Sequence, residues 1–425
     1  MLDFYDDEKN SIGEMTIRYK ISDTNELFVL NEQPSIMQNI LNYVFTKEES
    51  TILNYVKDDL IELITDSHYD RLLLFLGTFP ITNYYSDIYG VCDGINCETK
   101  CENPFCEKQY DFIESEKADK LYDQLQAAIC CYTNYFATWG IKKVRKVDWV
   151  DFQEIKLVLE RLKIEEKHFD SYKPGIENGA SYVSYFQSSN EDDNIDTLVI
   201  SFKGTTTILE TLHDLNCRYE EFQDGFVHSG IYRLAVLFLE KNWEMMKKKI
   251  NDNKLNKILL LGHSLGAALA VIVYFLLKEK VFCKNLTIKT VGFGCPPLFS
   301  RNIALREDLN IDLYTFGFDI TSRMSFGSML DLRYLFVSMG NLKSIINDKH
   351  AILKKINEIR HHIKSKDLNP KLYLPGNLYH VSKFKSSYKI KQVNCDFFDE
   401  ILICGKGLLD HFVHDLANAF FEPLN

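Results

Sequence analysis

Long apolar runs are missing from this 425-residue chain. A helix that crosses a bilayer needs about 18 or more consecutive apolar residues, and the longest apolar run here, Ala267–Leu277, is shorter. The start of the sequence, Met1–Glu8, is acidic and lacks the apolar centre of a secretory signal peptide. The sequence therefore predicts no transmembrane helix, no signal peptide and a cytoplasmic location.

An excess of basic charge is also absent, since the formal net charge at pH 7 is −11. This balance excludes nucleic acid as an expected partner and disfavours purely electrostatic docking on anionic membranes. It leaves neutral substrates open. The 29 phenylalanines and 23 tyrosines provide large apolar surfaces that can be buried or presented to a lipid.

Internal repeats and low-complexity linkers are absent as well, so domains have to be inferred from hydrophobic patterning. Residues 1–115 have helix-like spacing at Ser35–Phe45 and Glu49–Ile64 but no catalytic signature. We expect an N-terminal accessory region of unknown role over 1–115 and a second, larger domain over 116–425.

Strand and helix patterns alternate in the second domain, which predicts an α/β fold with a mostly parallel central sheet flanked by helices. Active sites in such sheets lie at the carboxyl ends of the strands. The expected helices are Lys117–Tyr135, Asp151–Leu162, Arg233–Lys249 and Ala267–Leu277, and the expected strands are Ala180–Gln187, Asp196–Lys203, Lys257–Leu261, Lys289–Gly294, Ile311–Phe316 and a strand-like run at Glu400–Cys404.

The most informative motif is Gly262–Gly266 (GHSLG), between a short apolar strand and a helix that begins with small residues. A strand that turns abruptly into a helix holds the central serine, Ser264, in a strained conformation with its hydroxyl exposed. A Cβ at Gly262 or Gly266 would collide with neighbouring backbone. The motif therefore predicts a nucleophile elbow, with the N–H of Leu265 aimed at a developing oxyanion.

A serine hydroxyl needs a general base and an orienting acid to act as a nucleophile near neutral pH. In α/β-hydrolases these follow the serine in the order Asp or Glu and then His. Asp319 follows a predicted strand and is the candidate acid, whereas Asp312 lies at the start of that strand. The candidate base is His411; its rivals are His414, His380, His361 and His362.

The chain resembles the class 3 lipases of the α/β-hydrolase fold, and looks most like their diacylglycerol lipase-like branch. The resemblance covers about residues 115–425 and is carried by an ordered set of short segments. These are Thr197–Thr205 (TLVISFKGT), Val227–Gly230 (VHSG), Gly262–Gly266 (GHSLG), Val291–Pro297 (VGFGCPP), Asp319–Ser325 (DITSRMS) and Leu409–His411 (LDH).

Carried over position by position, the resemblance implies a triad with Ser264 as nucleophile, Asp319 as orienting acid and His411 as general base. It implies an oxyanion hole formed by the N–H groups of Thr205 and Leu265. The supporting positions are Gly204, His228, Gly262, His263 and Gly266. We expect His263 to pack in the turn and His228 to brace the site through hydrogen bonds.

Two positions depart from the family pattern. Lys203 replaces an arginine, so a bidentate ion pair becomes a single point contact. Ser322 replaces a proline, which is expected to loosen the loop that places Asp319. Neither change removes a chemical group that the triad needs.

Three segments could contact lipid. Phe326–Met339 is rich in aromatic residues and methionine and fits either a mobile lid or a buried core helix. Thr206–Asn216 is a second lid candidate. Lys354–Lys366 is a basic run that could contact lipid headgroups or form an ordinary solvated helix face.

Four of the eleven cysteines are clustered at Cys92, Cys97, Cys101 and Cys106. Their wide spacing leaves zinc ligation, local disulfides and free thiols all open. The triad itself requires no metal or organic cofactor.

Together, these motifs and the resemblance predict a serine hydrolase that cleaves ester bonds of neutral glycerolipids, di- or triacylglycerol, through an acyl-enzyme. The expected partner is a lipid substrate, with transient contact with a membrane or lipid-droplet surface. The alternatives are phospholipase A1, a general carboxylesterase with the same triad, and a catalytically silent hydrolase fold used for binding. The sequence does not determine the oligomeric state.

Overall fold

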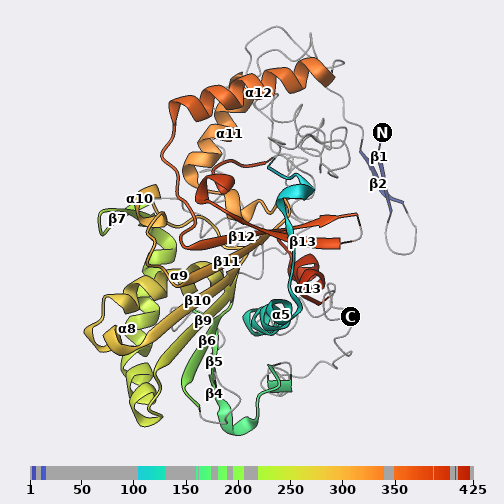
Figure 1. Ribbon diagram of the computed structural model, residues 1–425. Helices are drawn as coiled ribbons and strands as arrows, with labels where there is room; N and C mark the ends of the chain where they lie inside the picture. The colour runs from blue at the N-terminus through green and yellow to red at the C-terminus, as the bar shows by residue number, and fades with distance from the viewer. Residues whose placement is uncertain are drawn as a thin grey trace. The chain divides into compact units, whose positions relative to one another are not determined.

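A computed structural model shows how these segments are arranged (Figure 1). The described residues are 2–5, 11–15, 104–130, 159–160, 162–173, 180–188, 195–204, 219–338, 349–385, 387–402, 407 and 410–421. The chain divides into two compact units, Met1–Asn54 and Tyr55–Asn425. Most of the expected accessory region 1–115, including the helices expected at Ser35–Phe45 and Glu49–Ile64, lies outside the described residues.

In the first unit the described residues form a two-stranded antiparallel hairpin. Strand β1 is Leu2–Tyr5 and strand β2 is Ser11–Met15, and the register pairs Leu2 with Met15.

The second unit is built on a nine-stranded sheet in the order β3-β13-β12-β11-β10-β9-β6-β5-β4. Its five central strands run parallel: β6 Thr197–Phe202, β9 Lys257–His263, β10 Thr287–Phe293, β11 Ile311–Phe316 and β12 Asn377–Phe384. The flanking strands run antiparallel to their neighbours: β3 Asp111–Phe112, β13 Ser387–Val393, β5 Tyr182–Gln187 and β4 Phe169–Lys173. This is the predicted α/β-hydrolase architecture.

Helices cover both faces of this sheet (Figure 1). Helices α8 Ser229–Asp252 and α9 Leu265–Lys278 pack on one face, and α5 Ser115–Ile129 and α13 Val413–Phe421 pack on the other. Strand β9 shows why both faces are apolar. Leu260 belongs to the core under α9 and Leu261 to the core under α5, because successive side chains of a strand point to opposite faces.

The remaining elements lie outside these layers. They are the antiparallel hairpin β7 Tyr219–Phe222 and β8 Gly225–His228, the helices α10 Arg301–Ala304, α11 Phe326–Ser338 and α12 Lys349–Lys366, and the 3-10 turns Glu107–Gln109, Glu166–His168, Val281–Asn285, Thr321–Arg323 and Cys395–Phe398.

The sequence predicted the strand Ile311–Phe316 with its observed bounds, and seven other expected elements appear with shifted ends as α5, β5, β6, α8, β9, α9 and β10. The expected strand at Glu400–Cys404 is wrong for Glu400–Leu402, which form no strand. The last strands are β12 and β13, whose alternation of apolar and polar residues was overlooked. The helix expected at Asp151–Leu162 lies largely outside the described residues.

Candidate active site

The connection between β9 and α9 forms a sharp elbow at Ser264. This residue has φ 58° and ψ −129°, a conformation that residues with a side chain rarely adopt. Its N–H donates to the carbonyl oxygen of Phe293 at 2.9 Å, which ties the turn to the neighbouring strand. Strain of this kind persists only where the surroundings enforce it.

The glycines of the elbow allow very close backbone contacts. A Cβ on Gly262 would lie 2.2 Å from the carbonyl carbon and oxygen of Gly266. A Cβ on Gly266 would lie 2.2 Å from the carbonyl oxygen of Phe202, at the end of β6. Both collisions predicted from the sequence are confirmed, and they show that strand, turn and helix can approach this closely only without side chains at these two positions.

Three side chains from separate loops meet at this elbow. His411 Nε2 lies 2.9 Å from Ser264 Oγ. On the other side of the ring, His411 Nδ1 lies 3.0 and 3.1 Å from the two carboxylate oxygens of Asp319. An ionised carboxylate only accepts hydrogen bonds, so Nδ1 carries the proton and Nε2 is left to accept the hydrogen of the serine hydroxyl.

The surroundings of Asp319 keep its carboxylate charged although only 1% of the residue is exposed. Burial acts to raise the pKa of Asp319, but the adjacent His411 and the Thr321 N–H, which donates to Oδ1 at 2.8 Å, outweigh it. The pKa of Asp319 therefore lies below its usual value. A charged acid beside Nδ1 orients the imidazole and stabilises its protonated form.

His263 supports the loop that carries His411. Its Nε2–H donates to the His411 carbonyl oxygen at 3.0 Å, and the centroids of the two rings lie 4.9 Å apart. Burial and the nearby His411 lower the pKa of His263 to about 3, so this ring is neutral near neutral pH. It packs in the turn, as expected.

Comparison with known proteins shows that part of this chain is similar to a protein family. Residues 199–326 match the family described as lipase (class 3). This segment of the chain resembles the class 3 lipases.

Toxin TseL of Vibrio cholerae serotype O1 is 27% identical over 144 residues, which cover 33% of this chain and 22% of the toxin. The chain thus spans about a fifth of the toxin's length.

Solved lipase structures are also similar. A lipase from Rhizopus microsporus var. chinensis gives a TM-score of 0.45 at 14% identity, covering 75% of this chain and 94% of that one. A mutant form of MDLA from Penicillium cyclopium gives 0.44 at 13% identity, covering 72% and 99%.

Of the two expected oxyanion donors, the structure describes Leu265 but not Thr205. Leu265 is the first residue of α9, so its N–H lies in the first turn of that helix. Thr205 and the lid candidate Thr206–Asn216 lie outside the described residues. The backbone nitrogen of the preceding Gly204 would be 3.0 Å from a Cβ on Gly266, so the end of β6 borders the elbow.

His228 caps a helix and does not contact the triad. Its Nδ1 accepts a hydrogen bond from the Ile231 N–H at 3.4 Å, at the start of α8. Burial lowers the pKa of His228 to about 4, so the ring is neutral near neutral pH.

The rival acid and bases lie away from Ser264. Asp312 pairs with Lys289 at 2.7 Å at the beginning of β11. His380 is buried in β12, where its Nε2 bonds the Gly317 carbonyl and its Nδ1 the Tyr110 hydroxyl, both at 2.7 Å. The remaining candidates belong to helices: His414 is in α13, and His361 and His362 are in α12.

Two residues that position the loops were missed by the sequence analysis. The Ser322 hydroxyl donates to Asp319 Oδ2 at 3.3 Å and lies 3.1 Å from Thr315 Oγ1. Asp410 accepts the Phe318 N–H at 2.8 Å, which joins the loop before His411 to the loop of Asp319. The replacement of the family's proline by Ser322 could have indicated a hydrogen-bonding role, but the sequence analysis interpreted it as a loss of rigidity.

The cysteine cluster is only partly described. Cys106 is buried, and Cys92, Cys97 and Cys101 lie outside the described residues. Among the described residues no group of three or more His, Cys, Asp or Glu side chains could hold a metal ion. In the same ranges, none of the helices has the length and apolar character needed to cross a bilayer.

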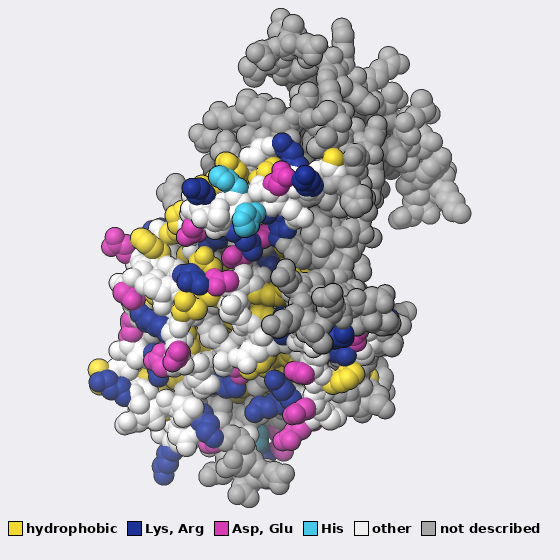
Figure 2. All heavy atoms as spheres, turned by 45° about the horizontal axis from the view of Figure 1, so that its top comes forward, with side chains coloured by type: hydrophobic (Ala, Val, Ile, Leu, Met, Phe, Trp, Pro, Cys, Tyr) yellow, Lys and Arg dark blue, Asp and Glu magenta, His cyan; other side chains and the backbone are white. Residues whose placement is uncertain are grey.

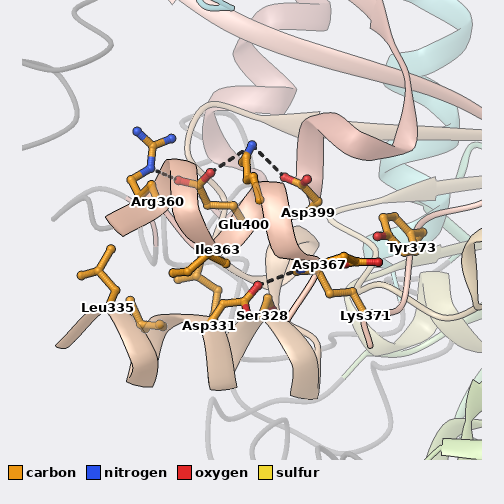
Figure 3. Close-up of a pocket in the computed structure, with 13 residues that line it drawn as sticks. Ser328, Asp331, Leu335, Arg360, Ile363, Asp367, Lys371, Tyr373, Asp399 and Glu400 are labelled. Atoms are coloured by element: carbon orange, nitrogen blue, oxygen red, sulfur yellow. Dashed lines mark hydrogen bonds and ion pairs between the residues drawn. The ribbon is translucent and has the colours of Figure 1, made fainter. Parts of the chain in front are cut away.

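A pocket lies apart from the triad, between α11 and α12 (Figure 3). Charged side chains dominate its wall and are joined in ion pairs, including Lys371 with Asp331 at 2.8 Å and Lys364 with Glu400 at 3.1 Å. The lining residues are Ser328, Asp331, Leu332, Leu335, Arg360, Ile363, Lys364, Asp367, Lys371, Tyr373, Asp399, Glu400 and Ile401. The segment expected to be a lid or a core helix thus forms α11, with Leu335 buried.

Proposed function

We propose that this chain is a serine hydrolase that cleaves ester bonds of neutral glycerolipids, di- or triacylglycerol, through an acyl-enzyme on Ser264. The observation that carries the proposal is the 2.9 Å contact between Ser264 Oγ and His411 Nε2, with Asp319 on the opposite ring nitrogen. A base in hydrogen-bond contact with a serine, itself oriented by a carboxylate, is the arrangement that activates a serine nucleophile.

In the first half-reaction, Ser264 Oγ attacks the ester carbonyl carbon while its proton passes to His411 Nε2. The negative charge that develops on the carbonyl oxygen is stabilised by the N–H groups of Leu265 and Thr205. The carbon–oxygen bond to glycerol then breaks, and His411 gives its proton to the leaving glycerol oxygen. The acyl group is left on Ser264.

In the second half-reaction, His411 takes a proton from a water molecule, and the resulting hydroxide attacks the acyl carbon. The bond to Ser264 Oγ breaks, the proton on His411 returns to the serine oxygen, and a fatty acid leaves. Asp319 stays ionised throughout and stabilises the imidazolium.

The test is covalent labelling by a fluorophosphonate, compared among wild type, Ser264→Ala, His411→Ala and His414→Ala. We expect labelling of the wild type and of His414→Ala, none of Ser264→Ala, and a large loss in His411→Ala. Labelling that persists in His411→Ala would assign the base to another residue. A folded wild type that resists labelling with and without detergent micelles would support a silent hydrolase fold.

If the protein reacts with the probe, its substrate class is tested by measuring the activity of unlabelled protein. The substrates are emulsified diolein and triolein, a phosphatidylcholine and p-nitrophenyl butyrate. Activity that rises when the glycerolipid passes its solubility limit supports a lipase. Release of the sn-1 fatty acid from phosphatidylcholine at a higher rate would favour phospholipase A1. Equal activity on monomeric short esters would favour a carboxylesterase.

A further inference from the structure

Helix α12 is a basic segment in an acidic protein. It contains six lysine or arginine residues against one acidic residue, Glu358, while the whole chain has a net charge of −11. Screening limits charge effects to about 10 Å at moderate salt, so a surface responds to its local charge and not to the total. The net charge therefore does not exclude anionic partners for this helix.

The inner side of α12 is fixed to the protein (Figure 3). Ile356 and Ile363, two turns apart, are 1% and 6% exposed. Arg360 pairs with Glu400, and Lys364 lies 3.1 Å from Glu400 and 3.3 Å from Asp399. Two apolar contacts and an ion-pair network hold the helix in one orientation.

Three other lysines of the helix take no part in this network. Lys354 and Lys366 are exposed and Lys355 is half-buried. Within the part of the chain that the structure describes, no carboxylate lies within ion-pair distance of these three lysines. Figure 2 shows dark blue and cyan side chains, with magenta ones among them, on this face of the molecule. Among the described residues, these lysine charges are therefore unpaired.

Apolar side chains border the same face. Tyr334 of α11 is 39% exposed and stacks on His362 at 6.0 Å between ring centroids. Leu368, just beyond the end of α12, is also 39% exposed. Basic residues next to an exposed tyrosine and leucine suit the interface of a bilayer, where headgroups attract the charge and the apolar side chains enter the acyl boundary.

We infer that the outer face of α12, with Tyr334 and Leu368 at its border, docks on an anionic phospholipid surface. We call it the α12 face, and it consists of Lys354, Lys355, Glu358, His361, His362, Lys366, Tyr334 and Leu368, with Glu358 as the single carboxylate that this helix contributes. The inference rests on the proposed function in one respect: a lipid hydrolase has to meet its substrate at such a surface. Helix α11, which packs on α12, begins at Phe326, seven residues after Asp319.

Nucleic acid is a less suitable occupant. Exposed Tyr334 and Leu368 gain nothing from a phosphate backbone in solution, whereas they lose water on entering a bilayer surface.

The experiment measures binding to phosphatidylcholine vesicles with and without phosphatidylglycerol, in a Ser264→Ala background that cannot consume lipid. The test variant is Lys354→Glu/Lys355→Glu/Lys366→Glu. The matched control is Lys241→Glu/Lys248→Glu/Lys278→Glu, three exposed lysines of α8 and α9. Figure 1 shows α8 at the end of the second unit opposite α12.

We expect binding only when phosphatidylglycerol is present, weakening as salt is raised. The α12 variant should bind about tenfold or more weakly, since each lysine near an anionic surface contributes several-fold. The α8/α9 variant should bind like the parent. The inference would be overturned if the parent and the α12 variant bound equally, or if both variants lost binding equally. It would also be overturned if the parent bound pure phosphatidylcholine as strongly, or if heparin retained it with the same salt sensitivity and vesicles were not preferred.

Two further measurements separate this inference from the proposed function. In the Ser264-containing protein, the α12 variant should keep its rate on soluble p-nitrophenyl butyrate, which shows that it is folded. The salt dependence of vesicle binding is measured on the unsubstituted protein, so this test does not depend on whether a variant folds. Vesicle binding without fluorophosphonate labelling would support the docking face and contradict the proposed hydrolase. Labelling without vesicle binding would support the hydrolase and contradict the docking face.

Discussion

Ser322 donates a hydrogen bond to Asp319, with its Oγ 3.3 Å from the carboxylate Oδ2. Ser322 is fully buried, and its hydroxyl also lies 3.1 Å from Thr315 Oγ1 on β11. The serine that stands in place of the family's proline thus links the acid to the neighbouring strand. It does not act as the loose point that the sequence analysis expected.

Replacing Ser322 by alanine should lower kcat with little change in KM. One neutral donor to a buried carboxylate is worth roughly 1 kcal/mol, which corresponds to about a fivefold effect. Ser322→Thr retains the hydroxyl and serves as the control. The measurement is kcat and KM for p-nitrophenyl butyrate across pH, and an unchanged kcat in Ser322→Ala at every pH would contradict the positioning role.

Asp319→Asn should nearly abolish turnover without unfolding the protein. Asparagine can present an N–H to His411 and favour the wrong imidazole tautomer, a change that costs about 10⁴-fold in kcat in a serine protease triad. The control is Asp312→Asn, because Asp312 pairs with Lys289 at the start of the strand. Single-turnover acylation rates provide the measurement, and comparable losses in the two variants would argue against a special role for Asp319.

Gly266→Ala should destabilise the fold. The added Cβ would lie 2.2 Å from the Phe202 carbonyl oxygen, so the helix or the strand has to move. Overpacking of this kind costs about 1–3 kcal/mol of unfolding free energy, measurable by urea denaturation. Gly230→Ala, in the first turn of α8 and without a positive φ, should not be destabilised. Equal midpoints for Gly266→Ala and wild type would refute the steric argument.

Stability should fall in mildly acidic solution because three histidines are buried in the neutral form. The pKa values of His263 and His380 are lowered to about 3 and that of His228 to about 4, in each case mainly by burial. Below the ordinary histidine pKa of about 6.5, the unfolded chain binds protons that the folded protein does not. Unfolding is therefore increasingly favoured as pH falls from about 6.5 towards 4, by about 1 kcal/mol per histidine between pH 6 and 5.

The measurement is the urea unfolding free energy at pH 7.5, 6 and 5. His380→Gln should be less stable than wild type at pH 7.5, since His380 bonds both Gly317 and Tyr110. It should nevertheless lose less stability between pH 6 and pH 5, because one titrating group is gone. An identical pH dependence in wild type and variant would show that His380 does not contribute to it.

Much of the core could be predicted from the sequence. The apolar run before Ser264, the small residues after it and the two flanking glycines predicted a strand, a tight turn and a buried helix, and β9 and α9 have this form. These features are local, because strand and helix periodicities and the steric needs of a turn are set by adjacent residues. Strands β12 and β13 were missed: β13 alternates apolar residues with lysines, and β12 contains the buried polar residues His380 and Ser382, which mask its apolar character.

The sequence by itself determined the elbow, the alternation of strands and helices and a short choice of acids and bases. Only the tertiary structure decided which histidine contacts Ser264, since His380, His411 and His414 have equal chemistry and the distances depend on how distant loops pack. The same holds for Ser322 and Asp410, whose hydrogen bonds join segments that meet only after the sheet has assembled. Local order follows from neighbouring residues, whereas a site made of three loops requires the long-range contacts that fix those loops together.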